Sequence, residues 1–515
     1  MLTQTPGDAF TAMLMGTLVF AEIFTLCGAS FLLFRTKGNP FAESASYAIV
    51  TVFMMLSFIH QIAFITGIPH LSTLLETCFL MISLVFIYRH RTCISSIFST
   101  LRGLGSSNPV AFTFLGICLI YMAGHGLLPV PKEFQNELYR IALYEKSGFF
   151  PLGAAAEFPA FLPVNHLILF NTFLRFDANA GAGIFCFLAY LSIGFSTYAL
   201  ARRYAWSKTA FTTSLLIMSM PRLVVQAIYP GTQIISICVA LFCILALYRS
   251  CEQPSLTDFI LLIFGLVFCV SENISSMIFA PILFVLSGIV LFRRHGMITW
   301  KSILTKNWYA LFAMVPIIIF SQSWLFLLNH LNKGEAPGLF SSIPLNPNGI
   351  QGALANFIRY LFESLNSAAP IELFFDKIFK WSMAENLESF YDVSIIPFLG
   401  DSGANQVFHL MGHPMGMFSF GPAGFFLVLP ALLYAMVKGP RRLKSVAIAF
   451  FVYFYLACLI MAWTPVNAKF FEIFYVCSGF SIAFFLPPWR FTKTKNQIFQ
   501  AGACALLFLT LVTAS

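Results

Sequence analysis

The sequence predicts an all-α protein that crosses a membrane about 13–14 times, in helices of the length that a lipid bilayer requires. Composition is the first sign, because 58% of the 515 residues are hydrophobic and only 10% are charged, whereas a soluble domain has about 25% charged residues. The second sign is that apolar residues gather in runs of about 17–25, each long enough to span the hydrocarbon core. Two long polar loops, 129–178 and 329–418, interrupt these runs.

The expected spans follow one another closely along the chain. An N-terminal group of spans lies within 1–108, and a core of spans lies within 109–328 and contains the first polar loop, 129–178. The second polar loop, 329–418, comes next, and the C-terminal spans lie within 419–515. In order, the expected spans are 11–34, 46–66, 71–88, 109–128, 180–201, 209–228, 231–248, 257–271, 274–292, 308–328, 419–437, 445–463, 469–487 and 498–515.

Basic residues fall unevenly between alternate loops. If the N-terminus lies outside, the inside loops hold twenty of the thirty Lys and Arg residues, as the positive-inside rule requires. Both long polar loops then lie on the same extracytoplasmic face. These inside loops also account for the net charge of +9, which does not call for a nucleic-acid partner. The inside residues are Arg35, Lys37, Arg89, Arg91, Arg102, Arg202, Arg203, Lys208, Arg249, Arg293, Arg294, Lys301, Lys306, Lys438, Arg441, Arg442, Lys444, Arg490, Lys493 and Lys495.

The second polar loop contains two segments with helical spacing of apolar residues, 350–366 and 371–389. We expect amphipathic helices there, lying along the membrane surface or over the helix bundle. A Gly-, Pro- and Met-rich stretch follows, which is typical of an ordered lid or a mobile flap. His409 and His413 in this stretch are four residues apart, but the adjacent Pro414 argues against a continuous helix. Loop histidines are therefore favoured over a metal site, and the twelve cysteines show no metal-type spacing.

Acidic and basic residues in the first polar loop are the main candidates for chemistry. Glu133 and Glu137 are four residues apart, so a helix would place both carboxylates on one face beside Arg140. Such acids could act as a general base or bind a divalent cation. Arg140, Arg175 and Lys469 lie on the same predicted face and could hold a phosphate or diphosphate. A surface helix of mixed charge would give a similar pattern.

Three carboxylates lie within or beside predicted spans. Glu22 and Glu76 fall inside spans, and Glu272 falls at the break between two spans. Carboxylates inside a membrane are costly and often functional, so each could belong to a proton or ion path. Neighbouring helices could equally satisfy them, and we favour this second interpretation.

Several stretches occur in an order that is found in a known family. They are NELYRIALYEKSG (136–148), EFPAFLPVNHLILF (157–170), STYALARRYAW (196–206), MPRLVVQAIYPGTQ (220–233), ANFIRYLFESL (355–365), HPMGMFSFGPAGFFLVLPALL (413–433) and WTPVNAKFF (463–471). In this order the chain resembles the bacterial GT-C superfamily of membrane glycosyltransferases, in particular its family-39-like, RgtA/B/C/D-like members.

The resemblance implies an enzyme of the bacterial inner membrane. It would move a sugar from a polyprenyl-phosphate donor to an acceptor such as lipopolysaccharide, a glycolipid or a protein. An acid of the first outer loop would act as base or bind metal, which here implies Glu133 or Glu137. The residues implied in substrate binding are Arg140, Glu157, His166, Arg175 and Lys469.

The chain departs from the family pattern at the expected catalytic aspartate. That aspartate aligns with Lys132 or Glu133, and the histidine of the family's Tyr-His-Leu-Pro-Arg-like run is Glu137 here. Only Leu138 and Arg140 of that run are kept. A small shift of register would let Glu133 or Glu137 supply the carboxylate. The spans before residue 109 would be an addition to the simplest version of the fold.

Two other functions remain open. A GT-C-like chain without catalysis could be a scaffold or assembly subunit of a membrane complex, which would bind partner chains stably. A transporter, polymerase or flippase of lipid-linked glycans would use Glu22 and Glu76. Transporters usually contain internal repeats, and this chain shows none, which counts against the transporter.

Overall fold

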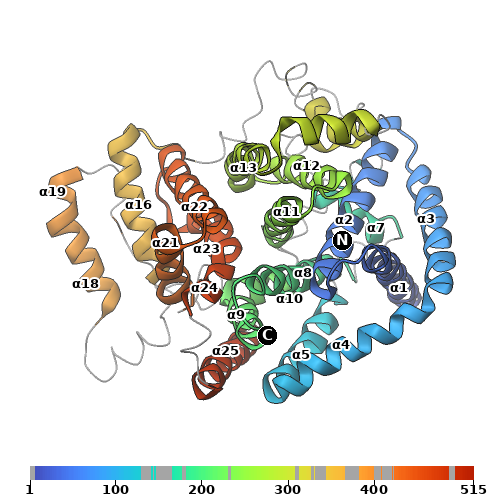
Figure 1. Cartoon of the computed structure of the whole chain (residues 1–515), viewed down its shortest axis with the longest axis horizontal. Helices are drawn as coiled ribbons and strands as arrows, with labels where there is room; N and C mark the ends of the chain where they lie inside the picture. The colour runs from blue at the N-terminus through green and yellow to red at the C-terminus, as the bar shows by residue number, and fades with distance from the viewer. Residues whose placement is uncertain are drawn as a thin grey trace. The chain divides into compact units, whose positions relative to one another are not determined.

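The computed structural model is helical throughout the part of the chain that it describes (Figure 1). Within that part, β pairing is limited to an isolated bridge between Leu345 and Met461. The predicted all-α class is therefore confirmed for these residues. The structure describes residues 6–128, 141–142, 144–145, 165–176, 181–229, 233–307, 312–325, 327, 330, 344–365, 382–399, 408, 420, 423–486 and 493–514.

Nine of the described helices are long and apolar enough to cross a membrane, or ten if one bent pair counts as a single span. This agrees with a polytopic membrane protein, and most of the nine match predicted spans within a few residues. They are α1 (Pro6–Thr36), α2 (Phe41–Thr66), α3 (His70–Arg89), α5 (Pro109–Gly126), α8 (Ile184–Ala201), α11 (Gln233–Glu252), α13 (Ile274–Lys306), α22 (Arg441–Ile460) and α25 (Lys493–Ala514).

Some predicted spans consist of shorter helices. The predicted span 209–228 consists of α9 (Ser207–Met218) and α10 (Pro221–Ile228), which are bent by 68° relative to each other. Pro221 explains the break, because its ring disfavours helical backbone at the preceding residue. The predicted span 469–487 contains η10 (Pro465–Phe471), α23 (Glu472–Ser478), η11 (Gly479–Ser481) and α24 (Ile482–Phe485). Further short apolar helices are α12 (Leu256–Val270), α14 (Met314–Ser321) and the segment Gly424–Lys438, which corresponds to the predicted span 419–437.

The described chain divides into two compact units, and the first carries most of the N-terminal helices. Unit 1 comprises 1–199, 226–273 and 291–337. In it α1, α2 and α3 pack against one another, and α11 packs against α12. The α2 and α11 helices are mostly buried, whereas α3 is mostly exposed. Two further helices, η1 (Arg91–Cys93) and α4 (Ile94–Ser107), lead from α3 to α5.

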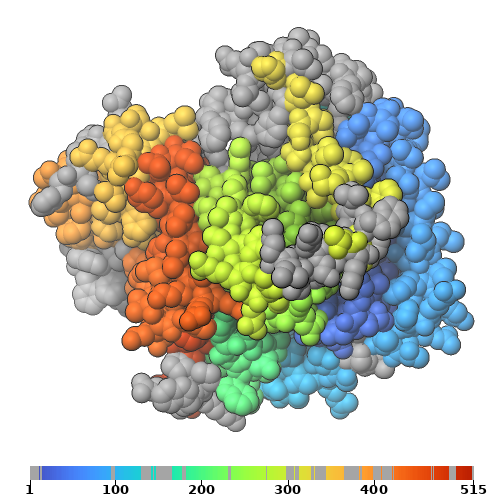
Figure 2. Space-filling model, turned by 45° about the horizontal axis from the view of Figure 1, so that its top comes forward, coloured from blue at the N-terminus to red at the C-terminus, as the bar shows by residue number. Residues whose placement is uncertain are grey.

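The exposed surface of α3 is apolar, as a surface facing lipid should be. Leu74, Met81 and Ile82 are all more than half exposed. In Figure 2 the blue residues of this part of the chain form a continuous outer surface of unit 1. A helix with a buried polar side and an apolar outer side suits a bundle inside a bilayer.

Unit 2 comprises 200–225, 274–290 and 338–515. Here α16 (Gly349–Leu365) confirms the helix predicted at 350–366 and packs against α22. Asn356 and Tyr360 of α16 bond to the backbone after α22, at Met461 and Ala462. The other helices of the unit are α18 (Met383–Phe390), η8 (Tyr391–Ile395), α19 (Ile396–Leu399), η9 (Gly424–Val428) and α21 (Leu429–Lys438). The part of the predicted helix 371–389 that precedes residue 382 lies outside the described residues.

Candidate functional site

The predicted site residues divide into those that the structure describes and those that lie outside it. His166 and Arg175 belong to unit 1, and Lys469 belongs to unit 2. Glu133, Glu137, Arg140 and Glu157 lie outside the described residues, as do His409 and His413. The site is therefore built from the described parts of the first polar loop, 141–145 without residue 143, and 165–176.

The loop segment 165–176 is buried in unit 1. It contains η5 (Leu167–Phe170) and α7 (Asn171–Leu174), and the apolar side chains from Leu167 to Phe173 are buried, whereas Leu174 and Phe176 are half-buried. Its polar side chains Asn165, Asn171 and Thr172 are fully buried as well. A buried polar group must find hydrogen-bond partners, so this segment is fixed by the contacts that it makes with α2, α3 and their neighbours.

Asn165 connects the loop to the ends of two helices. Its Nδ2 donates to the carbonyl oxygens of Phe268 (3.1 Å) and Phe320 (2.9 Å), which lie near the C-terminal ends of α12 and α14. These carbonyls belong to the last turn of a helix, where intrahelical partners are missing. Asn165 Oδ1 accepts from Gln61 (2.8 Å) and Gln322 (2.6 Å). One side chain therefore caps two helices and anchors the loop.

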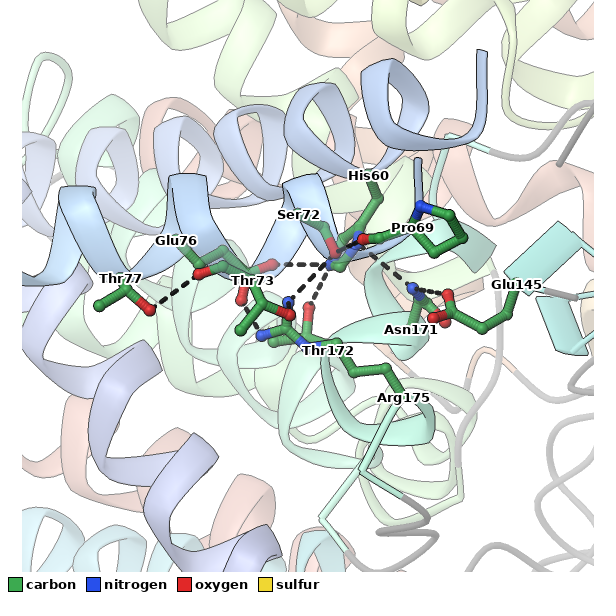
Figure 3. Close-up of polar contacts among 10 residues, drawn as sticks. All are labelled: His60, Pro69, Ser72, Thr73, Glu76, Thr77, Glu145, Asn171, Thr172 and Arg175. Atoms are coloured by element: carbon green, nitrogen blue, oxygen red, sulfur yellow. Dashed lines mark hydrogen bonds and ion pairs between the residues drawn. The ribbon is translucent and has the colours of Figure 1, made fainter. Parts of the chain in front are cut away.

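An ion cluster joins the same loop to α2 and α3 (Figure 3). Arg175 forms an ion pair with Glu76 of α3, and its Nη1 also donates to Ser72 and Thr73, each at 3.3 Å. On the other side, His60 Nε2 of α2 lies 2.9 Å from Glu76 Oε1. The side chains of His60 and Glu76 are 0% and 1% exposed. The predicted spanning carboxylate Glu76 is thus ion-paired with Arg175 and lies against His60.

The cluster continues from His60 to a carboxylate of the first loop. Asn171 Nδ2 lies 3.3 Å from His60 Nδ1 and donates to Glu145 Oε2 at 2.9 Å. Figure 3 shows Asn171 between the imidazole and Glu145. Glu145 is half-buried, whereas His60, Glu76 and Asn171 are buried. Among the described carboxylates of this cluster, Glu145 is the one that solvent or a substrate can reach.

His166 forms a second pair with the break between α12 and α13. Its Nδ1 lies 2.8 Å from Glu272 Oε2, and Ser236 donates to the same oxygen at 3.0 Å. Glu272 lies outside the segments that are long enough to cross a membrane. Burial raises the pKa of Glu272, and the nearby His166 and Ser236 only partly offset this effect. His166 therefore anchors the loop rather than facing an open surface.

The predicted phosphate ligands have different surroundings. The Arg175 guanidinium is engaged by Glu76 and buried. Lys469 of η10 is half-buried, with its Nζ 5.2 Å from the centroid of the Phe470 ring. Elsewhere in unit 2, Arg359 of α16 is fully buried and lies over the rings of Tyr391 (4.9 Å) and Trp463 (5.7 Å).

The sequence does not reveal that His60, Asn171 and Glu145 belong to one cluster. His60 lies in an apolar run, where a lone histidine is unremarkable, and Asn171 lies in an apolar stretch of the loop. Glu145 was visible only as one of several loop acids. No group of three His, Cys, Asp or Glu side chains within the described ranges is arranged to hold a metal ion.

Comparison with known proteins adds no relative. No protein-family model, curated protein or solved structure matches the chain. The arrangement that remains is chemical: a reachable carboxylate, oriented by an amide and backed by a buried ion cluster, in a polar loop packed among apolar helices.

Proposed function

We propose that the chain is a GT-C-type integral membrane glycosyltransferase, which transfers a sugar from a polyprenyl-phosphate donor to an acceptor at the extracytoplasmic face of a bacterial inner membrane. The observation that carries this proposal is the half-buried Glu145 carboxylate, which Asn171 holds at 2.9 Å. It belongs to the first polar loop, the predicted place of the catalytic acid. The loop is packed among helices that are long enough to cross a membrane, so the carboxylate is presented close to lipid-linked substrates.

A carboxylate in this position suits the base of an inverting transfer. The acceptor hydroxyl oxygen forms a bond to the anomeric carbon of the donor sugar, while the bond from that carbon to the phosphate oxygen breaks. The hydroxyl proton passes to Glu145, and the bonding electron pair leaves with the polyprenyl phosphate. Glu133 and Glu137 are the other candidates for this base.

The leaving phosphate needs a positive group. Arg175 is already paired with Glu76, so its role here is to hold the loop and not to bind the phosphate. Arg140 and Lys469 remain the proposed phosphate ligands, and Glu157 and His166 remain with the loop that carries the base. A divalent cation held by one or two loop acids would be another positive group for the leaving phosphate.

The test is turnover of radiolabelled undecaprenyl phosphate carrying glucose, mannose or galactose. The full chain in lipid nanodiscs is supplied with lipopolysaccharide, a glycolipid or a protein acceptor, and release of undecaprenyl phosphate is measured. Glu145→Gln should lower turnover about 10²–10⁴-fold, the usual contribution of a general base. Glu388→Gln in α18 makes the same chemical change in the second polar loop and should leave turnover unchanged.

The other outcomes reassign the function. Loss of turnover in Glu133→Gln or Glu137→Gln, with Glu145→Gln active, would move the base to that residue. No turnover of any donor, together with a partner chain that copurifies in a fixed ratio, would favour a scaffold or assembly subunit.

One observation favours a transporter of lipid-linked glycans as the second candidate. Transporters place broken helices at their binding sites, and α9 and α10 form a pair bent by 68°. Arg222 of α10 is ion-paired with Glu472 of α23, at the start of another interrupted segment. Transport of a fluorescent lipid-linked glycan across vesicle membranes, abolished by Glu22→Gln or Glu76→Gln, would support this candidate.

A further inference from the structure

We propose that Glu76 and His60 are positioning residues for Glu145, because they fix the side-chain amide of Asn171 in the one orientation that donates to this carboxylate. The inference rests on the proposed function for its consequence in catalysis. Its structural part, the direction of the hydrogen bonds, stands on the contacts alone.

Glu76 carries a negative charge. Its carboxylate is paired with Arg175 and buried. A buried guanidinium is stable only beside an anion, so Glu76 is ionised. An ionised carboxylate only accepts hydrogen bonds. His60 Nε2 lies 2.9 Å from Glu76 Oε1 and 3.1 Å from Thr172 Oγ1, a hydroxyl that can accept as well as donate. An unprotonated nitrogen would be repelled by the carboxylate oxygen at this distance, so Nε2 carries a proton.

The other ring nitrogen of His60, Nδ1, faces Asn171. Asn171 Nδ2 lies 3.3 Å from His60 Nδ1 and 2.9 Å from Glu145 Oε2. An ionised Glu145 requires a donor, so the amide nitrogen must face it. Two donors cannot face each other, and His60 Nδ1 must then be the acceptor. His60 is thus neutral, with its proton on Nε2.

Only the nitrogen of the Asn171 amide is held by hydrogen bonds. Asn171 Oδ1 is buried and has no hydrogen-bond partner, so only the bonds from Nδ2 orient the amide. If His60 carried its proton on Nδ1, the amide would have to turn over to present its oxygen. That oxygen would then face the Glu145 carboxylate. Glu76 therefore sets the tautomer of His60, and this tautomer decides whether the Asn171 amide presents its nitrogen or its oxygen to the Glu145 carboxylate.

In Glu76→Gln, Arg175 determines how the new side-chain amide is oriented. The new amide must present its oxygen to Arg175, and its NH₂ then faces His60 Nε2. His60 Nε2 becomes the acceptor and the proton moves to Nδ1. We expect this variant to exchange one neutral tautomer of His60 for the other and to release Glu145.

The experiment measures the ¹⁵N signals of the full chain, labelled at histidine and held in lipid nanodiscs. His60 is assigned by the signal that His60→Gln removes. The wild-type protein should show the Nε2–H tautomer, and Glu76→Gln should show the Nδ1–H tautomer. Glu22→Gln is the matched control, because Glu22 interacts electrostatically with Glu76 and Arg175 but has no hydrogen bond to His60. It should keep the wild-type tautomer.

Two further readouts connect the tautomer to Glu145. The carboxylate stretch of Glu145, assigned by infrared difference against Glu145→Gln, should shift in Glu76→Gln and not in Glu22→Gln. With a donor that the protein turns over, Glu76→Gln should lower kcat at least about tenfold with KM little changed, because a positioned base contributes to the chemical step. Glu76→Asp, which keeps the acceptor, should recover part of the rate.

A wild-type His60 that is charged or protonated on Nδ1 overturns the inference, and this result does not depend on any variant folding. An unshifted Glu145 stretch in Glu76→Gln, despite a changed tautomer, also overturns it. If the tautomer and the stretch both change as expected but no donor is turned over, the positioning network stands and the proposed glycosyltransferase fails.

Discussion

His166 Nδ1 lies 2.8 Å from Glu272 Oε2, so a residue of the first polar loop is paired with the break between α12 and α13. This contact and the Asn165 contacts hold the same stretch of loop from two sides. The pair therefore belongs to the frame of the site, and substitutions in it should change stability before they change chemistry.

The raised pKa of Glu272 gives a prediction for pH dependence. The folded state favours the protonated acid, so the contribution of Glu272 to stability is complete at low pH and is lost as pH rises through the raised pKa. Glu272→Gln cannot ionise and should remove this part of the pH dependence. Thermal unfolding of the two proteins across a range of pH would check it. A wild-type curve parallel to that of Glu272→Gln would contradict the expectation.

Asn165 should be one of the most sensitive polar positions in unit 1. Asn165→Leu leaves the carbonyls of Phe268 and Phe320 without the amide that donates to them. Each such buried group costs about 1–3 kcal/mol, so we expect a loss of at least about 2 kcal/mol. Asn386→Leu, at an exposed position of α18, is the control and should stay within about 0.5 kcal/mol. Equal unfolding temperatures for the two variants would show that Asn165 is not a cap.

Arg175 and Glu76 should be strongly coupled. Arg175→Leu leaves the Glu76 carboxylate buried without its cation, which typically costs about 3–5 kcal/mol. The double variant Arg175→Leu/Glu76→Gln should recover much of that loss, since no charge remains buried. A double-mutant cycle on unfolding measures the coupling. Additive effects of the two single substitutions would argue against an ion pair. As a control, Arg102→Ala at an exposed position should hardly change the free energy of unfolding.

The predicted sides of the loops can be tested with thiol chemistry. Ser106→Cys in α4 and Ser389→Cys in α18 are both exposed positions, and we expect them on opposite faces of the membrane. A membrane-impermeant maleimide applied to intact bacterial spheroplasts should label the second variant about tenfold faster or more. The unmodified chain, with its own twelve cysteines, gives the background. If only Ser106→Cys were labelled, the predicted topology would be the wrong way round.

The long helices could be predicted because each run of apolar residues is a local signal. The α2 helix nevertheless begins at Phe41 rather than at residue 46, because Pro40 marks its start and Glu43 and Ser44 within its first turn are buried by neighbours. The α4 helix was missed because its sequence is too polar for a span and directly follows Arg89 and Arg91. The start of α2 and the formation of α4 depend on tertiary contacts, which a local sequence pattern does not reveal.

The cluster around Glu145 could not be predicted for the same reason. His60 and Asn171 are 111 residues apart in sequence, and Arg175 and Glu76 are 99 apart. Nothing in the spacing of these residues indicates that they meet. The sequence did indicate that Glu76 needs a partner, and chemistry in the first polar loop stays a prediction. The partner, and the direction of the hydrogen bonds, required the packed structure.

The bonds of Asn165 also have a consequence for motion. Because one amide closes the ends of α12 and α14 and holds the loop, these three segments cannot loosen separately. In hydrogen-exchange terms they form one cooperative opening unit, in which the backbone amides around residues 165–170, 268–272 and 318–322 should exchange at a common rate. If binding of a substrate required this loop to move, the free energy of that motion would include loosening the ends of both helices.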